Sequence, residues 1–287
     1  MRKVTNNKRP RRLIVFTDLD GSLMNHSDYS WEAAKPALQC IREKRIPLVI
    51  CTSKTRREVE VIRSEMDISG PFIVENGGGI FFPPEYETLP TGGTIILNGM
   101  KCIPLGLSYS RIRSFMKESR KVYSIRGFGD MSLEEVSVLT GLPAGIAALA
   151  KEREFSEPFV LMHEDELDDL IKTANLKGLL IARGGRFFHC MGFGNDKGSA
   201  VKRVIDVFTR HWNARPLSIG FGDSPNDFPL LKAVDIPILI PHEDCSFEEL
   251  DLPDLVRAKF PGSRGWNEAL LGIMNDKGSK TRRSNIT

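Results

Sequence analysis

The first apolar run of the chain reads Leu13-Ile-Val-Phe-Thr-Asp18-Leu-Asp20-Gly-Ser-Leu23, and two aspartates stand where it ends. The apolar residues predict a buried strand, and the Asp-Gly-Ser triplet predicts the turn that terminates it. Because ligands bind at the carboxyl ends of strands in open parallel sheets, these carboxylates lie where chemistry is expected. The chain leaves the strand between them, so Asp18 can act as a nucleophile while Asp20 delivers and removes a proton. Taken alone, the same letters are more typical of a plain turn.

Strands and helices alternate from this run to about residue 84. Apolar strands are predicted at residues 46–51 and 72–75, and amphipathic helices at residues 30–44 and 54–66. This order of elements is typical of a parallel sheet with helices on its faces.

The alternation stops after residue 84, where prolines and glycines become frequent. Short strands are predicted near 94–98 and 102–105, and helices at 108–122, 132–140, 143–153 and 164–174. Two further strands, 179–183 and 186–191, are joined through Gly184-Gly185, which indicates a hairpin.

After Gly192 the first pattern returns, with helices predicted at 196–212, 224–234 and 265–274 and strands at 217–221 and 236–240. We therefore expect an α/β protein with a Rossmann-like, doubly wound parallel-sheet core. The core would be discontinuous, made of residues 12–84 and 192–275, and residues 85–191 would form an inserted α+β cap domain.

The five cysteines are widely spaced and form no CxxC pair, so neither a disulfide framework nor a zinc site is expected. The apolar runs are strand-sized and far below the ~20 residues that a membrane helix needs. The start of the chain is basic but lacks a long apolar region, and we interpret the protein as cytoplasmic, with no membrane partner.

The formal net charge of +3 comes from the two ends of the chain. Residues 1–11 and 276–287 are rich in Lys and Arg and are predicted to be flexible basic tails. Without residues 1–12 and 275–287, acidic residues outnumber basic ones and the body carries a charge of about −6. Nucleic acid is therefore not expected as a partner of the folded body.

A second acidic cluster, Gly220-Phe-Gly-Asp223-Ser-Pro-Asn226-Asp227, also follows an apolar strand. Part of it is typical of a helix start, with Asp223 as the cap and a proline in the first turn. Capping does not call for Asn226 and Asp227 as well. Oxygen ligands at two strand ends of one sheet instead indicate a site for Mg²⁺, a hard cation.

With these motifs in place, the sequence resembles the haloacid dehalogenase-like phosphohydrolases. The Asp18-Leu-Asp-Gly sequence matches the first family motif, Thr52 the second, Lys197 the third and Gly222-Asp-Ser-Pro-Asn-Asp227 the fourth. The resemblance implies that Asp18 becomes phosphorylated, that Asp20 is the general acid and base, and that Thr52 and Lys197 hold and neutralise the phosphoryl group. It assigns Mg²⁺ to Asp18, the Asp20 backbone carbonyl and Asp223, with Asp227 as a further metal-site residue.

More narrowly, the chain resembles the mannosyl-3-phosphoglycerate phosphatases. The matching stretches are Thr17–Leu23, Cys51–Arg56, Phe72–Gly77, Arg126–Met131, Arg153–Phe159 and Gly184–Phe187. The insertion resembles the large α+β (C2-type) cap of one branch of the superfamily, which closes over the core and selects the substrate. The resemblance implies a small phosphorylated sugar acid as substrate.

Such a substrate needs cations for its carboxylate and polar groups for its hydroxyls. The candidate substrate-binding residues are Ser53, Lys54, Glu75, Asn76, Gly77, Arg183, Gly185, Arg186 and Asn226. Each also has an ordinary interpretation, since hairpin arginines are commonly solvated and Glu75-Asn76-Gly77 can simply turn the chain. His189 is expected to pack or to make a structural hydrogen bond.

Three alternatives to the mannosyl ester remain open. No feature of the sequence indicates the configuration of a single sugar hydroxyl. A glucosyl-3-phosphoglycerate or another sugar phosphate is therefore equally compatible with it. A phosphomutase could use the same core. In a different functional class, a nucleic-acid-binding module would use the basic tails. The sequence leaves the oligomeric state open between monomer and dimer.

Overall fold

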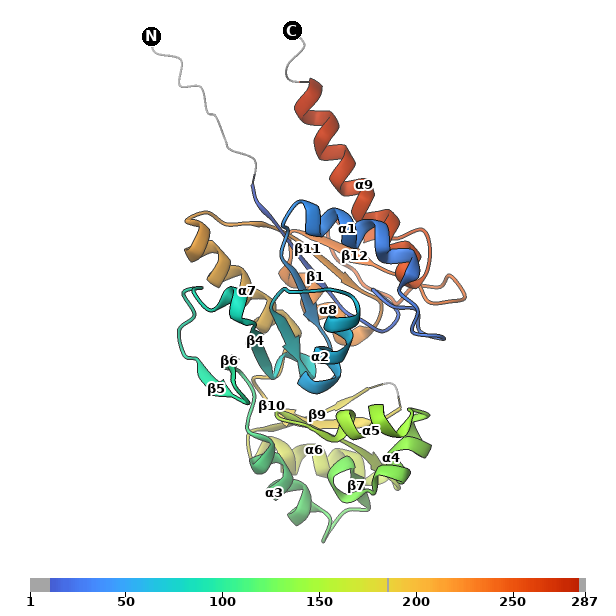
Figure 1. Cartoon of the computed structure of the whole chain (residues 1–287). Coiled ribbons are helices and arrows are strands. Elements are labelled where there is room, and N and C mark those ends of the chain that lie inside the picture. Colours follow the sequence, from blue (N-terminus) through green and yellow to red (C-terminus); the bar gives the residue numbers. More distant parts are fainter. Residues whose placement is uncertain (1–10, 185, 284–287) are drawn as a thin grey trace.

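The computed structural model describes residues 11–184 and 186–283, with side chains described as far as residue 275. Figure 1 shows two parts, a large sheet with helices on both of its faces and a smaller sheet with its own helices beneath it. The fold class predicted from the sequence, a Rossmann-like α/β core with an inserted α+β cap, is confirmed.

The core sheet has nine strands in the order β13-β12-β11-β1-β2-β3-β4-β6-β5. The strands from β13 to β3 pair in parallel, with β1 at the centre between β2 and β11. Their bounds are Leu13–Thr17 (β1), Leu48–Cys51 (β2), Phe72–Val74 (β3), Leu217–Gly222 (β11), Ile236–Leu239 (β12) and Val256–Arg257 (β13). All carboxyl ends of these strands therefore lie along one edge of the sheet.

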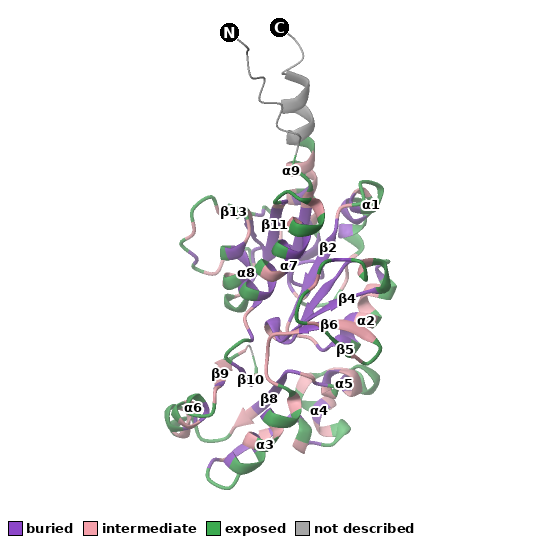
Figure 2. Ribbon diagram, turned by 90° about the vertical axis from the view of Figure 1, so that its left-hand side faces the viewer, coloured by how far each residue is buried: buried purple, intermediate pink, exposed green. Residues whose placement is uncertain are grey.

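Alternate residues of the central strands pack on opposite faces, as the strand period of two requires. Val15 packs with helices α1 (Lys35–Glu43), α2 (Arg56–Glu65) and α9 (Gly262–Arg283). Ile14 and Phe16 pack with α7 (Lys197–Trp212) and α8 (Phe228–Ala233). Buried residues accordingly fill the strands β2, β4 and β11 in Figure 2.

The core sheet continues beyond β3 through an antiparallel extension. Strand β4 (Gly79–Phe82) pairs with β3, and β6 (Met100–Pro104) and β5 (Ile95–Leu97) follow. The cap boundary expected at residue 84 therefore falls inside the core sheet, because the proline-rich segment after β4 only loops out before the chain returns to pair with β4. The second sheet begins later, at β7.

The cap contains a four-stranded antiparallel sheet in the order β7-β8-β10-β9. Its strands are Ile125–Gly127 (β7), Ser156–Leu161 (β8), Leu179–Arg183 (β9) and Phe188–Gly192 (β10). The predicted hairpin is confirmed, since β9 pairs antiparallel with β10. Strands β7 and β8 were not anticipated from the sequence.

The cap sheet has one face packed on helices and one face turned toward the core. Helices α3 (Tyr109–Ser119) and α6 (Leu167–Asn175) cover the first face, where Phe188 and Cys190 pack. Helices α4 (Leu133–Thr140) and α5 (Ala144–Lys151) form a separate small cluster with Phe128 and Val160. The alternate residues of β9 and β10 remain on the core side and are free to line a site.

The last helix, α9, runs away from the cap (Figure 1). The predicted last helix is longer than expected, because α9 continues to Arg283, through residues that were assigned to the C-terminal tail. Residues 1–10 and 284–287, the remainder of the predicted tails, lie outside the described residues.

No single helix among residues 11–184 and 186–283 is long and apolar enough to cross a membrane. Helices α4 and α5 reach the necessary length and apolar composition only when they are taken together, and the pair is bent by 106° between them.

Candidate active site

The candidate catalytic residues gather where neighbouring parallel strands end. Asp18 follows β1, Thr52 follows β2 and Asp223 follows β11. Lys197 is the first residue of α7, whose preceding residue Asp196 caps the helix by accepting hydrogen bonds from the backbone N–H groups of residues 198 and 199. The strand register thus brings together residues that lie as far as 200 positions apart in the sequence.

Lys197 forms the centre of this group. Its buried ammonium group donates to Asp18 Oδ1 at 2.9 Å and to Asp227 Oδ1 at 2.6 Å. The other oxygen of Asp227 accepts from the backbone N–H groups of Asp223 and Ser224 and from the Ser224 hydroxyl. Both oxygens of Asp227 are therefore committed to holding the lysine and the loop after β11.

Carboxylate oxygens of Asp18, Asp223 and Asp227 lie within 4.8 Å of one another and are buried, a spacing that suits one metal ion. Ser22 donates its hydroxyl hydrogen to Asp223 Oδ1 at 3.2 Å and so orients that carboxylate. Gly21 lies so close that a Cβ at this position would be 2.4 Å from Asp223 Oδ2, so glycine is needed there.

Shifted pKa values of these groups indicate excess negative charge in the cluster. Burial raises the pKa of Asp18 well above its ordinary value, although the charge of Lys197 opposes this. Burial and the charge of Asp227 raise the pKa of Asp223 to about 7. Burial alone would lower the pKa of Lys197, but the charges of Asp18 and Asp227 outweigh it and raise that pKa. One ammonium group does not neutralise three carboxylates, so the cluster favours a further cation.

Asp20 lies beside the cluster in a different environment. Its Oδ2 accepts from Lys54 Nζ at 2.7 Å, whereas its Oδ1 is buried without a hydrogen-bond partner. Burial lowers the pKa of Lys54, but the charge of Asp20 outweighs it and raises that pKa, so the Lys54 ammonium group remains charged. An unpartnered carboxylate oxygen next to the nucleophile is suited to exchanging a proton with a bound ligand.

The loops after β2 and β3 support each other on the side of the core that faces the cap. The backbone N–H of Asn76 donates to the Thr52 carbonyl, and Thr52 Oγ1 accepts from the backbone N–H of Lys54 at 3.2 Å. Glu75, Asn76 and Gly77 follow with positive φ values of 51°, 57° and 95°. Such backbone strain in consecutive residues is typical of functional sites.

A cavity of about 380 Å³ extends from Lys197 toward the cap, and we call it the lysine cavity. The core contributes Ser53, Asn76, Lys197 and Asn226 to its walls, and the cap contributes Leu180, Ala182, Arg183, Gly184, His189 and Met191. Asn226 donates to Asn76 Oδ1 at 3.5 Å across it. Four of the candidate substrate-binding residues therefore share this space.

A second cavity of about 200 Å³, the Asp20 cavity, shares Ser53 and His189 with the lysine cavity. Asp20 and Lys54 line it from the core, and Arg153, Arg186, Phe187 and His189 line it from the cap. A wider hollow of about 760 Å³ reaches Gly21, Asp223 and Ser224 from a third direction. The cluster is thus open both toward the cap and toward this hollow.

The structure gives Glu75 and Gly77 positions that differ from the sequence expectation. Glu75 is fully buried and accepts from the backbone N–H groups of Glu154 and Phe155 and from the Ser156 hydroxyl. It fastens the core to the cap and lines neither cavity, so it is not positioned to contact sugar hydroxyls. Gly77 packs against the backbone of Asp196, next to Lys197. Gly185 lies outside the described residues.

Sequence reasoning missed the residues that join the two parts. Asn195 donates to the carbonyls of Glu75 and Phe155 at 3.1 Å each, and Arg153 donates to the Ser53 carbonyl at 3.2 Å. Both are buried. No local pattern marks such residues, because their partners come from segments that only tertiary folding brings near.

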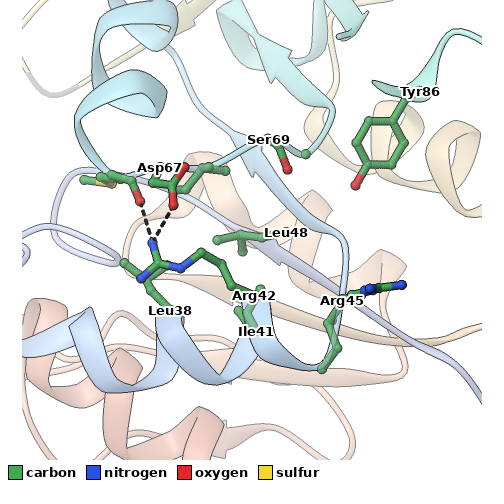
Figure 3. Close-up of a pocket in the computed structure, with 12 residues that line it drawn as sticks. Leu38, Ile41, Arg42, Arg45, Leu48, Asp67, Ser69 and Tyr86 are labelled. Atoms are coloured by element: carbon green, nitrogen blue, oxygen red, sulfur yellow. Dashed lines mark hydrogen bonds and ion pairs between the residues drawn. The ribbon is translucent and has the colours of Figure 1, made fainter. Parts of the chain in front are cut away.

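Another pocket, of about 230 Å³, lies at the opposite edge of the core sheet (Figure 3). Leu48 at the start of β2 and Ser69 before β3 line it, and Arg42 donates to Asp67 at 3.2 Å beside it. It is therefore far along the strands from Asp18 and Thr52 and takes no part in the catalytic cluster.

Comparisons with known proteins agree with this geometry. A family model described as haloacid dehalogenase-like hydrolase matches residues 15–89. The chain is 48% identical over 267 residues to a glucosyl-3-phosphoglycerate/mannosyl-3-phosphoglycerate phosphatase of Persephonella marina, covering 92% of this chain and 98% of that protein. It is 34% identical to a mannosyl-3-phosphoglycerate phosphatase of Pyrococcus furiosus, covering 79% and 90%.

Among solved structures, a haloacid dehalogenase-like hydrolase from Bacteroides thetaiotaomicron matches with a TM-score of 0.64 and 17% identity, covering 92% of this chain and all of that chain. The sucrose-phosphatase of a Synechocystis species, solved with sucrose and phosphate, matches with a TM-score of 0.60 and 13% identity, covering 92% and 98%. These distant matches establish the shared fold.

Proposed function

Because the chain belongs to the mannosyl-3-phosphoglycerate phosphatase family of haloacid dehalogenase-like hydrolases and is a phosphoric monoester hydrolase, we propose that it hydrolyses glycosyl-3-phosphoglycerates. The mannosyl ester would yield mannosylglycerate and phosphate, and the glucosyl ester would react in the same way. The observation that carries this proposal is the cluster of Asp18, Lys197, Asp223 and Asp227 beneath a cap.

In the proposed reaction, Asp18 attacks the phosphorus and forms an aspartyl-phosphate while Asp20 protonates the departing oxygen. Asp20 then removes a proton from the water that attacks the aspartyl-phosphate, which releases inorganic phosphate and regenerates Asp18. The unpartnered Oδ1 of Asp20 supports this role. Lys54 holds the other oxygen of Asp20 and so fixes the orientation of the carboxyl group.

The residues of the cluster fit Mg²⁺. Asp18, Asp223 and the backbone carbonyl of Asp20 are the proposed ligands, because both oxygens of Asp227 already accept hydrogen bonds from other groups. Bound there, Mg²⁺ would offset the charge of the phosphate dianion that otherwise repels Asp18. Thr52 is the proposed hydroxyl ligand of the phosphoryl oxygens, and Lys197 supplies the neighbouring positive charge.

The rest of the substrate has room in the two cavities. The lysine cavity and the Asp20 cavity share Ser53 and His189 in their walls, and both lie between the core and the cap, where the organic part of a substrate with its phosphate near Asp18 is proposed to bind. Arg186 lines the Asp20 cavity and is exposed enough to turn toward the glycerate carboxylate. Arg183 lines the lysine cavity but donates to Glu164 at 3.4 Å and lies over the Phe188 ring, so it is the weaker candidate. Asn76 and Asn226 are the proposed core contacts.

We propose the glucosyl ester as a second substrate because the relative with 48% identity is named for both esters. A panel of both glycosyl-3-phosphoglycerates and several plain sugar phosphates, each with and without Mg²⁺, tests the proposal through release of free phosphate. We expect Mg²⁺-dependent release from the glycosyl-3-phosphoglycerates at the highest kcat/KM. Absence of release from both esters would contradict the substrate, and transfer of phosphate within a sugar would indicate a mutase.

Binding of nucleic acid by the basic ends would be a function of a different class. We expect that deleting residues 1–10 leaves phosphate release at the level of the full chain. If the deletion removed that activity, our assignment of these residues to a tail without a catalytic role would be wrong.

A further inference from the structure

One ionisable side chain in the cap takes no part in the chemistry above. His189 lies in β10, between Phe188 and Cys190, which pack on the opposite face of the cap sheet. Strand alternation therefore turns His189 toward the core. It is one of two residues, with Ser53, that line both the lysine cavity and the Asp20 cavity. Its side chain thus borders both cavities.

The two ring nitrogens of His189 have different surroundings. Nδ1 is buried and has no hydrogen-bond partner. Nε2 lies beside Gly184, where an added Cβ would be only 2.8 Å away, and Gly184 lines the lysine cavity too. The lack of a side chain at Gly184 therefore keeps Nε2 accessible from that cavity.

These surroundings select one form of the imidazole. A buried N–H without an acceptor is more costly than a buried lone pair, so the proton of the neutral ring belongs on Nε2. Burial and the charge of Arg153 lower the pKa of His189 to about 3, so the ring remains neutral near pH 7. His189 thus offers the lysine cavity a single uncharged donor, the Nε2–H group.

An uncharged donor between cations has a distinct use. Lys197 is assigned to the phosphoryl group, Lys54 holds Asp20, and Arg186 is available for a carboxylate. A neutral donor at a fixed position can pair with a sugar hydroxyl without attracting the phosphate or the carboxylate, and a site built around such a hydrogen bond rejects substrates that lack the hydroxyl.

We propose that Nε2–H of His189 donates a hydrogen bond to a hydroxyl group of the sugar and makes His189 a specificity-determining residue. This inference rests on the proposed function, since it requires a glycosyl substrate beneath the cap. It differs from the expectation from the sequence that His189 serves packing or a structural hydrogen bond.

The test compares two substrates in the full-length protein with Mg²⁺. One is mannosyl-3-phosphoglycerate, and the other is p-nitrophenyl phosphate, which has no sugar hydroxyl. The measured quantity is kcat/KM for mannosyl-3-phosphoglycerate divided by kcat/KM for p-nitrophenyl phosphate. For His189→Phe we expect this ratio to fall by about tenfold to a hundredfold, because one polar group of the substrate is left without a partner. His189→Gln places an amide N–H where Nε2 was and should restore most of the ratio.

The matched control is His163→Phe, the same replacement at an exposed cap position outside both cavities. We expect it to keep the wild-type ratio. An unchanged ratio in His189→Phe would overturn the inference, as would an equal loss in His189→Gln. A wild-type protein that hydrolyses p-nitrophenyl phosphate but no glycosyl-3-phosphoglycerate would instead contradict the proposed function, on which the role of His189 depends.

Discussion

At the scale of single residues, the site is defined by charge that is only partly balanced. Lys197 holds Asp18 and Asp227, while Asp223 is left with Ser22 and a raised pKa. The sequence motifs predict which residues gather here, because each motif ends a strand or starts a helix. The motifs do not predict that both carboxylate oxygens of Asp227 accept hydrogen bonds from other groups of the protein, because one of those bonds depends on where Lys197 lies.

We expect Asp18→Asn to lower phosphate release by at least about a thousandfold, because an amide is not a nucleophile toward phosphorus. The fold should remain intact, since the amide oxygen can still accept from Lys197 and one buried charge is removed. Steady-state kinetics and thermal unfolding of the metal-free proteins measure both effects. Residual activity within tenfold of wild type would rule out Asp18 as the nucleophile.

We expect Mg²⁺ to raise the melting temperature more at pH 8 than at pH 6. The pKa values of Asp18 and Asp223 are raised in the folded protein, so protons stabilise the metal-free fold, and this stabilisation is lost as the pH rises through about 7 for Asp223. Mg²⁺ needs the ionised carboxylates, so protons compete with it below that pH. Thermal unfolding with and without Mg²⁺ measures the difference. A larger shift at pH 6 would contradict this linkage.

At the scale of elements, the apolar runs predict the strands of the central sheet and the amphipathic patterns predict most helices. Strand β8 was missed because Glu157 and Pro158 interrupt its apolar character. The buried Glu157 is accommodated by Arg113 at 2.8 Å and by the Tyr109 hydroxyl at 2.7 Å, both from α3. Such compensation between elements leaves no periodic signal in the sequence.

The loop after β3 provides a prediction at this scale. Gly77 has a φ of 95°, and a Cβ there would be 2.4 Å from the Asp196 carbonyl oxygen. We expect Gly77→Ala to lower the free energy of unfolding by about 1–3 kcal/mol and to lower kcat, because Asp196 precedes Lys197. Urea unfolding and kinetics measure these changes.

Gly93→Ala is the matched control, since Gly93 has a φ of 72° but nothing within 4 Å of its Cβ position. It should show the cost of the left-handed backbone without the clash, and kcat should not change. If Gly77→Ala behaved like Gly93→Ala, the contact with Asp196 would have no role in positioning Lys197.

At the scale of the whole molecule, the core and the cap are joined by buried polar contacts beside the site. The Glu75 carboxylate binds three donors of residues 154–156, and Arg56 donates to Glu154 at 3.0 Å. The discontinuous core and its inserted cap were predictable from the change in sequence pattern. These contacts were not, because Glu75 is 79 residues from its nearest cap partner.

We expect Glu75→Ala to lower the free energy of unfolding by about 2–4 kcal/mol, because it leaves buried donors unpaired. It should also raise KM for mannosyl-3-phosphoglycerate by loosening the cap. Glu75→Gln keeps one acceptor oxygen, so it should lower the free energy of unfolding less and raise KM less than Glu75→Ala does. Equal stability of wild type and Glu75→Ala in chemical unfolding would show that the contact does not hold the cap.

The most direct measurement for the chain as a whole is chemical trapping of the phosphorylated protein. With p-nitrophenyl phosphate, whose leaving group needs no proton, Asp20→Asn should form the aspartyl-phosphate and hydrolyse it slowly. Acid quenching, borohydride reduction and peptide mass spectrometry then locate the acyl phosphate as homoserine. We expect homoserine at position 18 only when substrate and Mg²⁺ are present. Its absence there, or its appearance at another aspartate, would contradict the catalytic role of Asp18.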